Sequence, residues 1–112
     1  MRYIHYLDTE RAKKAVLNTA IDEKILEVRE LEGTGREYDS TRGTTLYLHT
    51  TKNGGKIYYY YHWTRWQGEE DQISITDEED AKNFCETNIQ YLNENEVEHL
   101  EAIGMLNLEE TA

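Results

Sequence analysis

The sequence contains no proline, one cysteine and one phenylalanine, and it has no long apolar run. Without proline, no proline-rich linker divides the chain, and 112 residues fit a single domain over residues 1–112. One cysteine excludes a disulfide within the chain, which fits a reducing compartment. A membrane-spanning helix needs about 18 apolar residues in a row, and residues 1–5 lack the apolar core of a secretory signal. We therefore expect a single-domain, cytoplasmic protein without a membrane anchor.

Basic residues are scarce in the second half of the chain. Residues 1–66 carry 9 acidic and 11 basic side chains, whereas residues 67–112 carry 14 acidic side chains and a single basic one. The formal net charge is −11, and such a surface repels phosphates, so we expect no general binding of nucleic acid. The acidic surface serves solubility in the simplest interpretation. The alternative is an acidic patch that mimics nucleic acid and binds a basic partner, as in an inhibitor carried by a phage or plasmid. Its residues would be Glu94, Glu96 and Glu98.

Aromatic residues gather in residues 44–66, which include the run Tyr58–Tyr61. This stretch predicts a β-hairpin with strands over Thr44–Thr51 and Lys56–Trp66, because the Asn-Gly step within Asn53–Gly55 is the strongest short hairpin signal. A two-residue turn at Asn-Gly or at Gly-Gly gives the same two faces. A three-residue loop would reassign them, because a one-residue slip turns every side chain over.

With a two-residue turn, the hairpin has one aliphatic face and one polar aromatic face. The expected core face consists of Leu46, Leu48, Ile57, Tyr59, Tyr61 and Trp63. The second face consists of Tyr47, His49, Tyr58, Tyr60, His62 and Trp66. Tyrosine and tryptophan suit interfaces, because they combine a large area with few rotatable bonds and a polar tip. We expect this second face to bind a protein partner or a second copy in a homodimer. The binding residues would be Tyr47, Tyr58, Tyr60, His62 and Trp66.

Two alternatives for the second face stay open. A helix, such as one near the N-terminus, could cover it, and both faces would then be internal. Bases of single-stranded nucleic acid could also stack on it, although the net charge opposes this use. The cations for such a site would be Arg36, Arg42, Lys52, Lys56 and Arg65.

The N-terminal segment predicts one helix and one strand. Residues 2–7 fit a short strand or the approach to a helix. Asp8 is a good N-cap, and apolar residues at three- and four-residue spacing predict an amphipathic helix over Thr9–Thr19. The segment up to residue 32 alternates like a strand but also has helical spacing, and we favour a strand over Ile25–Leu31. A long polar loop follows over Gly33–Gly43.

The C-terminal segment predicts a strand over Gln72–Thr76 and two helices. Thr76 at the N-cap and Glu79 at the third helical position form a capping box for a helix over Asp77–Leu92. Its apolar stripe contains Ala81, Phe84, Cys85, Ile89 and Leu92. After a second cap, a short helix ends near Gly104. The apolar residues that follow it, Met105, Leu106 and Leu108, need a surface on which to dock.

These elements predict the α+β class. The predicted fold is an antiparallel β-meander of three to four strands, packed against N-terminal and C-terminal helices. The order of the meander is Ile25–Leu31, Thr44–Thr51, Lys56–Trp66 and Gln72–Thr76.

The hairpin, the next strand and the following helix resemble a pattern found in small uncharacterised proteins of prokaryotes and mobile elements. In this chain the pattern consists of Thr45-Leu46-Tyr47, Thr50, Gly54 or Gly55, Tyr58-Tyr59-Tyr60, Ile73 to Ile75, and Thr76 to Phe84. The resemblance implies a strand, a turn, further strand and a capped helix. It implies no particular activity.

No motif indicates catalysis or a metal site. His49 and His62 would share a face without lying opposite each other, and neither C-x-x-C nor H-E-x-x-H occurs. Cys85 lies on an apolar helical stripe, which is typical of a buried, unreactive thiol. Nothing near the carboxylates of residues 69–71 and 77–80 would desolvate one of them and raise its pKa. We therefore expect a non-enzymatic interaction module that needs no cofactor or metal.

Overall fold

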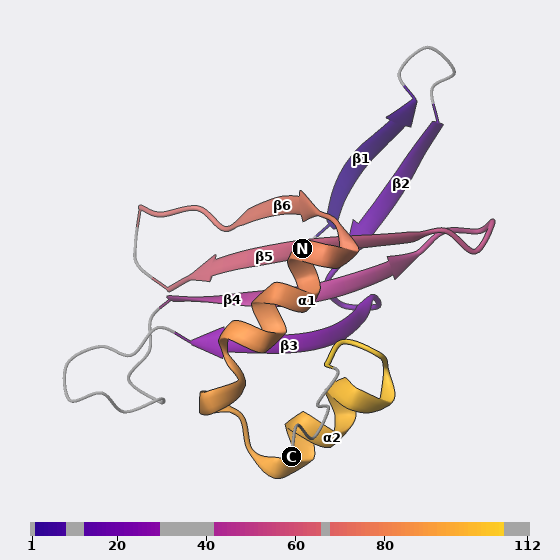
Figure 1. The fold of residues 1–112 in the computed structure, drawn as a ribbon. Helices are drawn as coiled ribbons and strands as arrows, with labels where there is room; N and C mark the ends of the chain where they lie inside the picture. Colours follow the sequence, from indigo (N-terminus) through magenta and orange to yellow (C-terminus); the bar gives the residue numbers. More distant parts are fainter. Residues whose placement is uncertain (1, 9–12, 30–41, 66–67, 107–112) are drawn as a thin grey trace.

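The computed structural model describes residues 2–8, 13–29, 42–65 and 68–106, and not the side chains of residues 6, 8 and 13. Within these ranges the chain forms two antiparallel sheets and two α-helices (Figure 1). The smaller sheet pairs β1 (Arg2–Asp8) with β2 (Lys13–Asn18), and the larger sheet has the order β3-β4-β5-β6. The bounds in the larger sheet are β3 (Glu23–Arg29), β4 (Arg42–Thr50), β5 (Lys56–Thr64) and β6 (Gln72–Thr76). The predicted α+β class and the four-stranded meander are confirmed.

The helices follow the meander in the chain. They are α1 (Glu78–Thr87) and α2 (Glu94–Ala102), with a 3₁₀ turn, η2 (Ile89–Tyr91), between them. The single helix predicted over Asp77–Leu92 is therefore an α-helix followed by this turn. The segment that fitted both a strand and a helix is the strand β3, and residues 30 and 31 of the prediction lie outside the described residues.

The cap of α1 lies one residue later than predicted. Asp77 is the N-cap, and its carboxylate accepts a hydrogen bond from the backbone N–H of Asp80 at 2.7 Å. Thr76 instead donates its hydroxyl hydrogen to the Asp80 carboxylate at 2.7 Å. The second cap is confirmed, because Asn93 and Glu96 form a capping box at the start of α2.

The helix predicted over Thr9–Thr19 is wrong. Residues 13–18 of this segment form β2, which pairs with β1 in a hairpin, and residues 9–12 lie outside the described residues. Ala15 and Leu17 are buried at a spacing of two residues, which is the period of a strand. The spacing of the alanines and Val16 also fits a helix. The strand forms because it pairs with β1, with Tyr3 opposite Leu17 and Ile4 opposite Val16.

The loop between β4 and β5 has three residues, Lys52–Gly54, instead of the predicted two. The N–H of Thr51 donates to the carbonyl of Gly55 at 2.8 Å, and the N–H of Gly54 donates to the carbonyl of Thr51 at 3.0 Å. Gly54 has a φ of +83°, as expected where a turn is followed by a left-handed residue. The strands are therefore paired one residue away from the predicted register.

This register reassigns both faces of the hairpin. Leu46 pairs with Tyr60, Leu48 with Tyr58, and Tyr47 with Tyr59. One face, called the helix face below, carries Leu46, Leu48, Tyr58, Tyr60 and His62. The opposite face, called the outer face, carries Tyr47, His49, Ile57, Tyr59, Tyr61 and Trp63 from these two strands, and Ile73 and Ile75 from β6. The predicted grouping of side chains is wrong, although each strand alternates as expected.

The main core lies between the helix face and the two helices. α1 crosses this side of the sheet, and α2 lies beyond β3 (Figure 1). The apolar stripe predicted for the helix Asp77–Leu92 contributes to this core in full: Ala81, Phe84 and Cys85 lie on α1, Ile89 lies on η2, and Leu92 follows η2. The C-terminal tail docks there too, with Met105 and Leu106 buried, while residue 108 lies outside the described residues.

A second, smaller core lies on the outer face. Ala15 and Leu17 of the hairpin β1–β2 pack against Ile57 and Tyr59, with Tyr47 and Ile73 at its border. The hairpin then diverges from the larger sheet, so that its far end projects beyond the sheet (Figure 1). Helices therefore cover one face, and a β-hairpin covers part of the other.

Candidate functional site

The part of the outer face beyond the hairpin is the candidate interaction surface. Tyr47, Tyr61, Trp63 and Ile73 are half-buried there, and Ile75 is 38% exposed. The helices lie on the opposite side of the sheet, so they do not cover these side chains (Figure 1). Aromatic and aliphatic groups that are held in place yet partly open are typical of protein interfaces.

The aromatic rings of this surface form a packed row. The Tyr47 ring stacks on Tyr59 with centroids 5.4 Å apart and meets Tyr61 edge-on at 6.5 Å. The Trp63 ring lies over Gly43 on the neighbouring strand, where a Cβ atom would come within 2.3 Å of the indole. The guanidinium carbon of Arg65 lies 5.5 Å from the centre of the Trp63 ring. Each ring of the row therefore packs on a neighbouring ring or on backbone.

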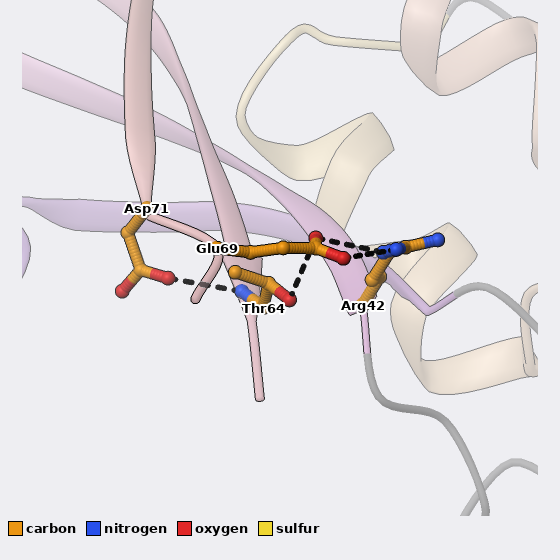
Figure 2. Close-up of polar contacts among 4 residues, drawn as sticks. All are labelled: Arg42, Thr64, Glu69 and Asp71. Carbon is orange, nitrogen blue, oxygen red and sulfur yellow. Dashed lines mark hydrogen bonds and ion pairs between the residues drawn. The ribbon is translucent and has the colours of Figure 1, made fainter. Parts of the chain in front are cut away.

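A polar network closes the end of the sheet next to Trp63 (Figure 2). Arg42 makes a two-pronged ion pair with Glu69, in which its Nε donates to Oε2 at 3.1 Å. Thr64 donates its hydroxyl hydrogen to Glu69 at 3.2 Å, and its backbone N–H donates to Asp71 at 2.9 Å. The hydrogen bond from Arg42 lowers the pKa of the Glu69 carboxyl. The network joins the start of β4, the end of β5 and the turn before β6.

Tyr61 links this network to the aromatic row. Its hydroxyl donates to the second carboxylate oxygen of Asp71. Burial, together with the hydrogen bond to Asp71, raises the pKa of Tyr61 to about 12. The surface thus has a row of rings at its centre and a polar rim at its end, the usual anatomy of an interface.

A buried carboxylate joins the hairpin to the sheet at the other end of the outer face. The Asp22 side chain is only 6% exposed and accepts hydrogen bonds from the His49 Nδ1–H at 2.8 Å and the Tyr59 hydroxyl at 2.6 Å. It also accepts the backbone N–H of Asn18 at 2.8 Å. Burial and the hydrogen bond to Asp22 raise the pKa of Tyr59. Tyr59 is 0% exposed, so its hydroxyl does not face a substrate. The cluster instead holds β2, β4 and β5 together.

The five predicted partner-binding residues do not lie on one surface. Tyr58, Tyr60 and His62 belong to the helix face, Tyr47 belongs to the outer face, and Trp66 lies outside the described residues. The cause is the three-residue loop, which shifts β5 by one residue against β4. The structure adds Tyr61 and Trp63 to Tyr47, two residues that the two-residue turn had assigned to the core.

The three residues of the helix face have partners within the protein. Tyr58 is buried, and the Tyr60 hydroxyl donates to the Asp80 carboxylate at 2.5 Å. The His62 ring lies 3.0 Å from the hydroxyls of both Thr44 and Ser74. His49 and His62 therefore lie on opposite faces of the sheet, which corrects their predicted placement on one face.

The acidic residues Glu94, Glu96 and Glu98 all lie on α2. Glu94 and Glu98 are exposed, whereas Glu96 is half-buried and accepts the backbone N–H of Asn93 in the capping box at 3.2 Å. Cys85 is fully buried, and burial raises the pKa of its thiol to about 11, so the thiolate is disfavoured. Among the described residues, no group of three or more histidine, cysteine, aspartate or glutamate side chains could hold a metal ion.

Comparison of the chain with protein-family models, curated proteins and solved structures finds no significant match. In the part of the chain that the structure describes, no helix has both the length and the apolar character needed to cross a membrane.

Proposed function

We propose that the protein is a non-catalytic interaction module that self-associates through the outer face and the hairpin β1–β2. The observation that carries this proposal is that both surfaces leave large apolar groups open. Tyr3, Ile4 and Leu7 of β1 are 40–50% exposed, and Ile75 of the outer face is 38% exposed. A two-stranded hairpin is marginally stable alone in water, so packing against a second copy would stabilise the part that projects from the sheet.

The distribution of charge supports a second copy as the partner. The hairpin strands carry exposed Arg2 and Lys14, while exposed Glu70 and the Glu69 that is paired with Arg42 lie at the rim of the outer face. The cations Arg2 and Lys14 of one copy's hairpin complement the Glu70 carboxylate of the other copy, which favours contact between the hairpin and the outer face. The shape agrees, because the radius of gyration is 15.7 Å, against about 13 Å for a compact domain of this length.

Sedimentation velocity tests self-association with two matched substitutions. Ile75 on the outer face and Ile103 after α2 are 38% and 37% exposed, so lysine at either position has a similar intrinsic cost. We expect the wild type to sediment as a dimer at micromolar concentration, Ile75→Lys to weaken the dimer at least tenfold, and Ile103→Lys to leave it unchanged. A wild type that stays monomeric at every concentration contradicts the proposal. Equal weakening by both substitutions contradicts the assigned surface.

We propose the acidic inhibitor as the second candidate. The exposed carboxylates of Glu94, Glu98 and Glu101 on α2 favour it. A mimic of nucleic acid would bind an arginine-rich peptide strongly at low salt and weakly at high salt. Charge reversal of Glu94, Glu96 and Glu98 should then remove most of the binding in fluorescence anisotropy. Binding that does not depend on salt contradicts this candidate.

A further inference from the structure

The loop of residues 52–54 between β4 and β5 contains the single asparagine–glycine step of the sequence, Asn53-Gly54. All three residues of the loop are exposed, and so are Gly55 and Lys56 after it. The loop lies at the end of the larger sheet, clear of both helices (Figure 1). Water therefore reaches both the Asn53 side chain and the peptide bond that follows it.

Asparagine is chemically labile in proteins, and its reactivity depends on the residue that follows it. The backbone nitrogen of that residue can attack the side-chain amide carbon, which closes a five-membered succinimide ring. A new C–N bond forms and the bond from this carbon to the amide nitrogen breaks. The proton lost by the backbone nitrogen balances the one that the amide group takes up when it leaves as ammonia. Water then adds to one of the two ring carbonyl carbons and breaks the C–N bond there, which gives aspartate or isoaspartate.

Gly54 leaves its backbone nitrogen open to this reaction. It has no side chain, and a Cβ atom at this position would meet no group within 4 Å beyond the neighbouring residues. Its N–H donates to the Thr51 carbonyl at 3.0 Å, and this hydrogen bond has to open before the nitrogen can attack. One hydrogen bond in an exposed loop contributes little to stability, so the loop opens locally without unfolding of the sheet.

Asn95 on α2 is exposed as well but lies in a different setting. The residue after it is Glu96, whose side chain flanks the nitrogen that would have to attack. The Glu96 N–H also donates to the Asn93 side chain at 2.8 Å in the capping box of α2. Attack at Asn95 therefore requires the first turn of a helix to open, so Asn95 is a matched comparison for Asn53.

We propose that Asn53 is a site of spontaneous deamidation in the folded protein and that the isoaspartate product weakens the hairpin β4–β5. In isoaspartate the main chain runs through the side-chain carbons, which adds one CH₂ group to the backbone of the loop. Three hydrogen bonds fix the present length of this loop. They join Thr51 N–H to the Gly55 carbonyl at 2.8 Å, Gly54 N–H to the Thr51 carbonyl at 3.0 Å, and Gly55 N–H to the Thr51 hydroxyl at 2.9 Å. The longer loop loses part of this set, and the proposal does not depend on self-association.

Incubation of the full chain at pH 8 and 37 °C, followed by digestion and mass spectrometry, tests the reaction. We expect Asn53 to deamidate at least tenfold faster than Asn95, and the product to contain isoaspartate as well as aspartate. The rate should rise with pH, because the attacking nitrogen has to lose its proton. Equal rates at the two asparagines overturn the proposal. A product that is aspartate alone also overturns it, because direct hydrolysis of the amide by water gives no isoaspartate.

Urea unfolding tests the effect on the hairpin. Anion exchange separates the deamidated protein, which has gained a negative charge, and Asn53→Asp has the same charge on an ordinary backbone. We expect the isoaspartate-rich fraction to unfold at a lower urea concentration than fresh wild type, and Asn53→Asp to unfold close to wild type. If the fraction and Asn53→Asp unfold alike, the longer backbone does not disturb the loop and the effect on the hairpin is overturned. It is overturned as well if Asn53→Gln, which would need a slower six-membered ring closure, loses stability during incubation as fast as wild type.

Discussion

The two faces of the larger sheet have similar aromatic residues but are covered in different ways. On the helix face, Tyr58 and Leu46 are buried under two helices that follow the sheet in the chain. On the outer face, a hairpin covers Tyr59 at one end, and Tyr61 and Trp63 stay half-buried at the other. Aromatic content alone therefore does not distinguish a core face from a binding face. The difference lies in which segments of the chain pack against each face.

On both faces, tyrosine hydroxyl groups donate hydrogen bonds to aspartate side chains. Tyr59, Tyr60 and Tyr61 follow one another in β5, and each donates to a different aspartate, namely Asp22, Asp80 and Asp71. A buried hydroxyl without an acceptor is costly. Part of the chain's acidity therefore satisfies its own tyrosines, which reduces the share that has to be explained by a basic partner.

The largest expected effect is a loss of packing on the helix face. Leu46 is 0% exposed, so Leu46→Ala leaves a cavity and should lower the free energy of unfolding by about 3 kcal/mol. Ile75→Ala on the outer face should cost less than about 1 kcal/mol, because 38% of Ile75 is already exposed. Urea unfolding of both variants measures the difference. Equal losses would mean that a second element covers the outer face as fully as the helices cover theirs.

The next effect concerns the outer face alone. Gly43→Ala places a Cβ atom within 2.3 Å of the Trp63 ring, so the indole has to move, at a cost of about 1–3 kcal/mol. Tryptophan fluorescence should shift, and urea unfolding should show the loss of stability. In a Trp63→Leu background the same substitution should cost much less, because the ring is gone. An additive double variant would contradict the close contact between these two residues.

Prediction from sequence succeeded where the pattern was local. The strand Gln72–Thr76 and the apolar stripe of the helix that follows it depend on neighbours in the chain, and both were predicted. The register was missed because Asn53-Gly54-Gly55 allows loops of two or three residues, and a difference of one residue exchanges the faces. The N-terminal hairpin was missed because its decisive contacts are between strands.

The buried cluster around Asp22 shows a second limit of prediction. Asp22 meets His49 and Tyr59, which are 27 and 37 residues away in the sequence. No local pattern marks an aspartate in a turn as the acceptor for two distant side chains. Of the candidate surface, only Tyr47 was predicted. Tyr61 and Trp63 share its face only in the observed pairing of β4 with β5, which the local sequence does not determine.

The third effect depends on alkaline pH. An unfolded tyrosine has a pKa near 10, whereas the pKa of Tyr61 in the folded protein is about 12. The folded state therefore keeps a proton that the unfolded state loses, so this stabilisation is complete below pH 10 and disappears between about pH 10 and 12. For a half-buried group we expect a loss of about 1–2 kcal/mol. Urea unfolding from pH 8 to 11.5 measures it.

Phenylalanine substitutions assign the alkaline effect to the two faces. Tyr61→Phe on the outer face and Tyr60→Phe on the helix face should each make the decrease in stability above pH 10 shallower, since the pKa of both hydroxyls is raised. Tyr3→Phe is a control, because this residue is 40% exposed on the hairpin. If it makes the decrease as shallow as the other two substitutions do, the decrease does not come from these two hydroxyl groups.

The smallest effect is expected at the rim of the outer face. Glu69→Gln removes the ion pair with Arg42, whose side chain is 44% exposed, and solvent screens such pairs. The lowered pKa of Glu69 means that its stabilisation is present above its ordinary pKa and is lost as the pH falls through the folded value. We expect a small decrease in Tm at pH 7 that becomes smaller in 1 M salt and disappears at low pH. A decrease that is large and independent of salt would mean that the rim supports the aromatic row by packing rather than by charge. The outer face would then resemble the helix face more closely than the exposure of its side chains indicates.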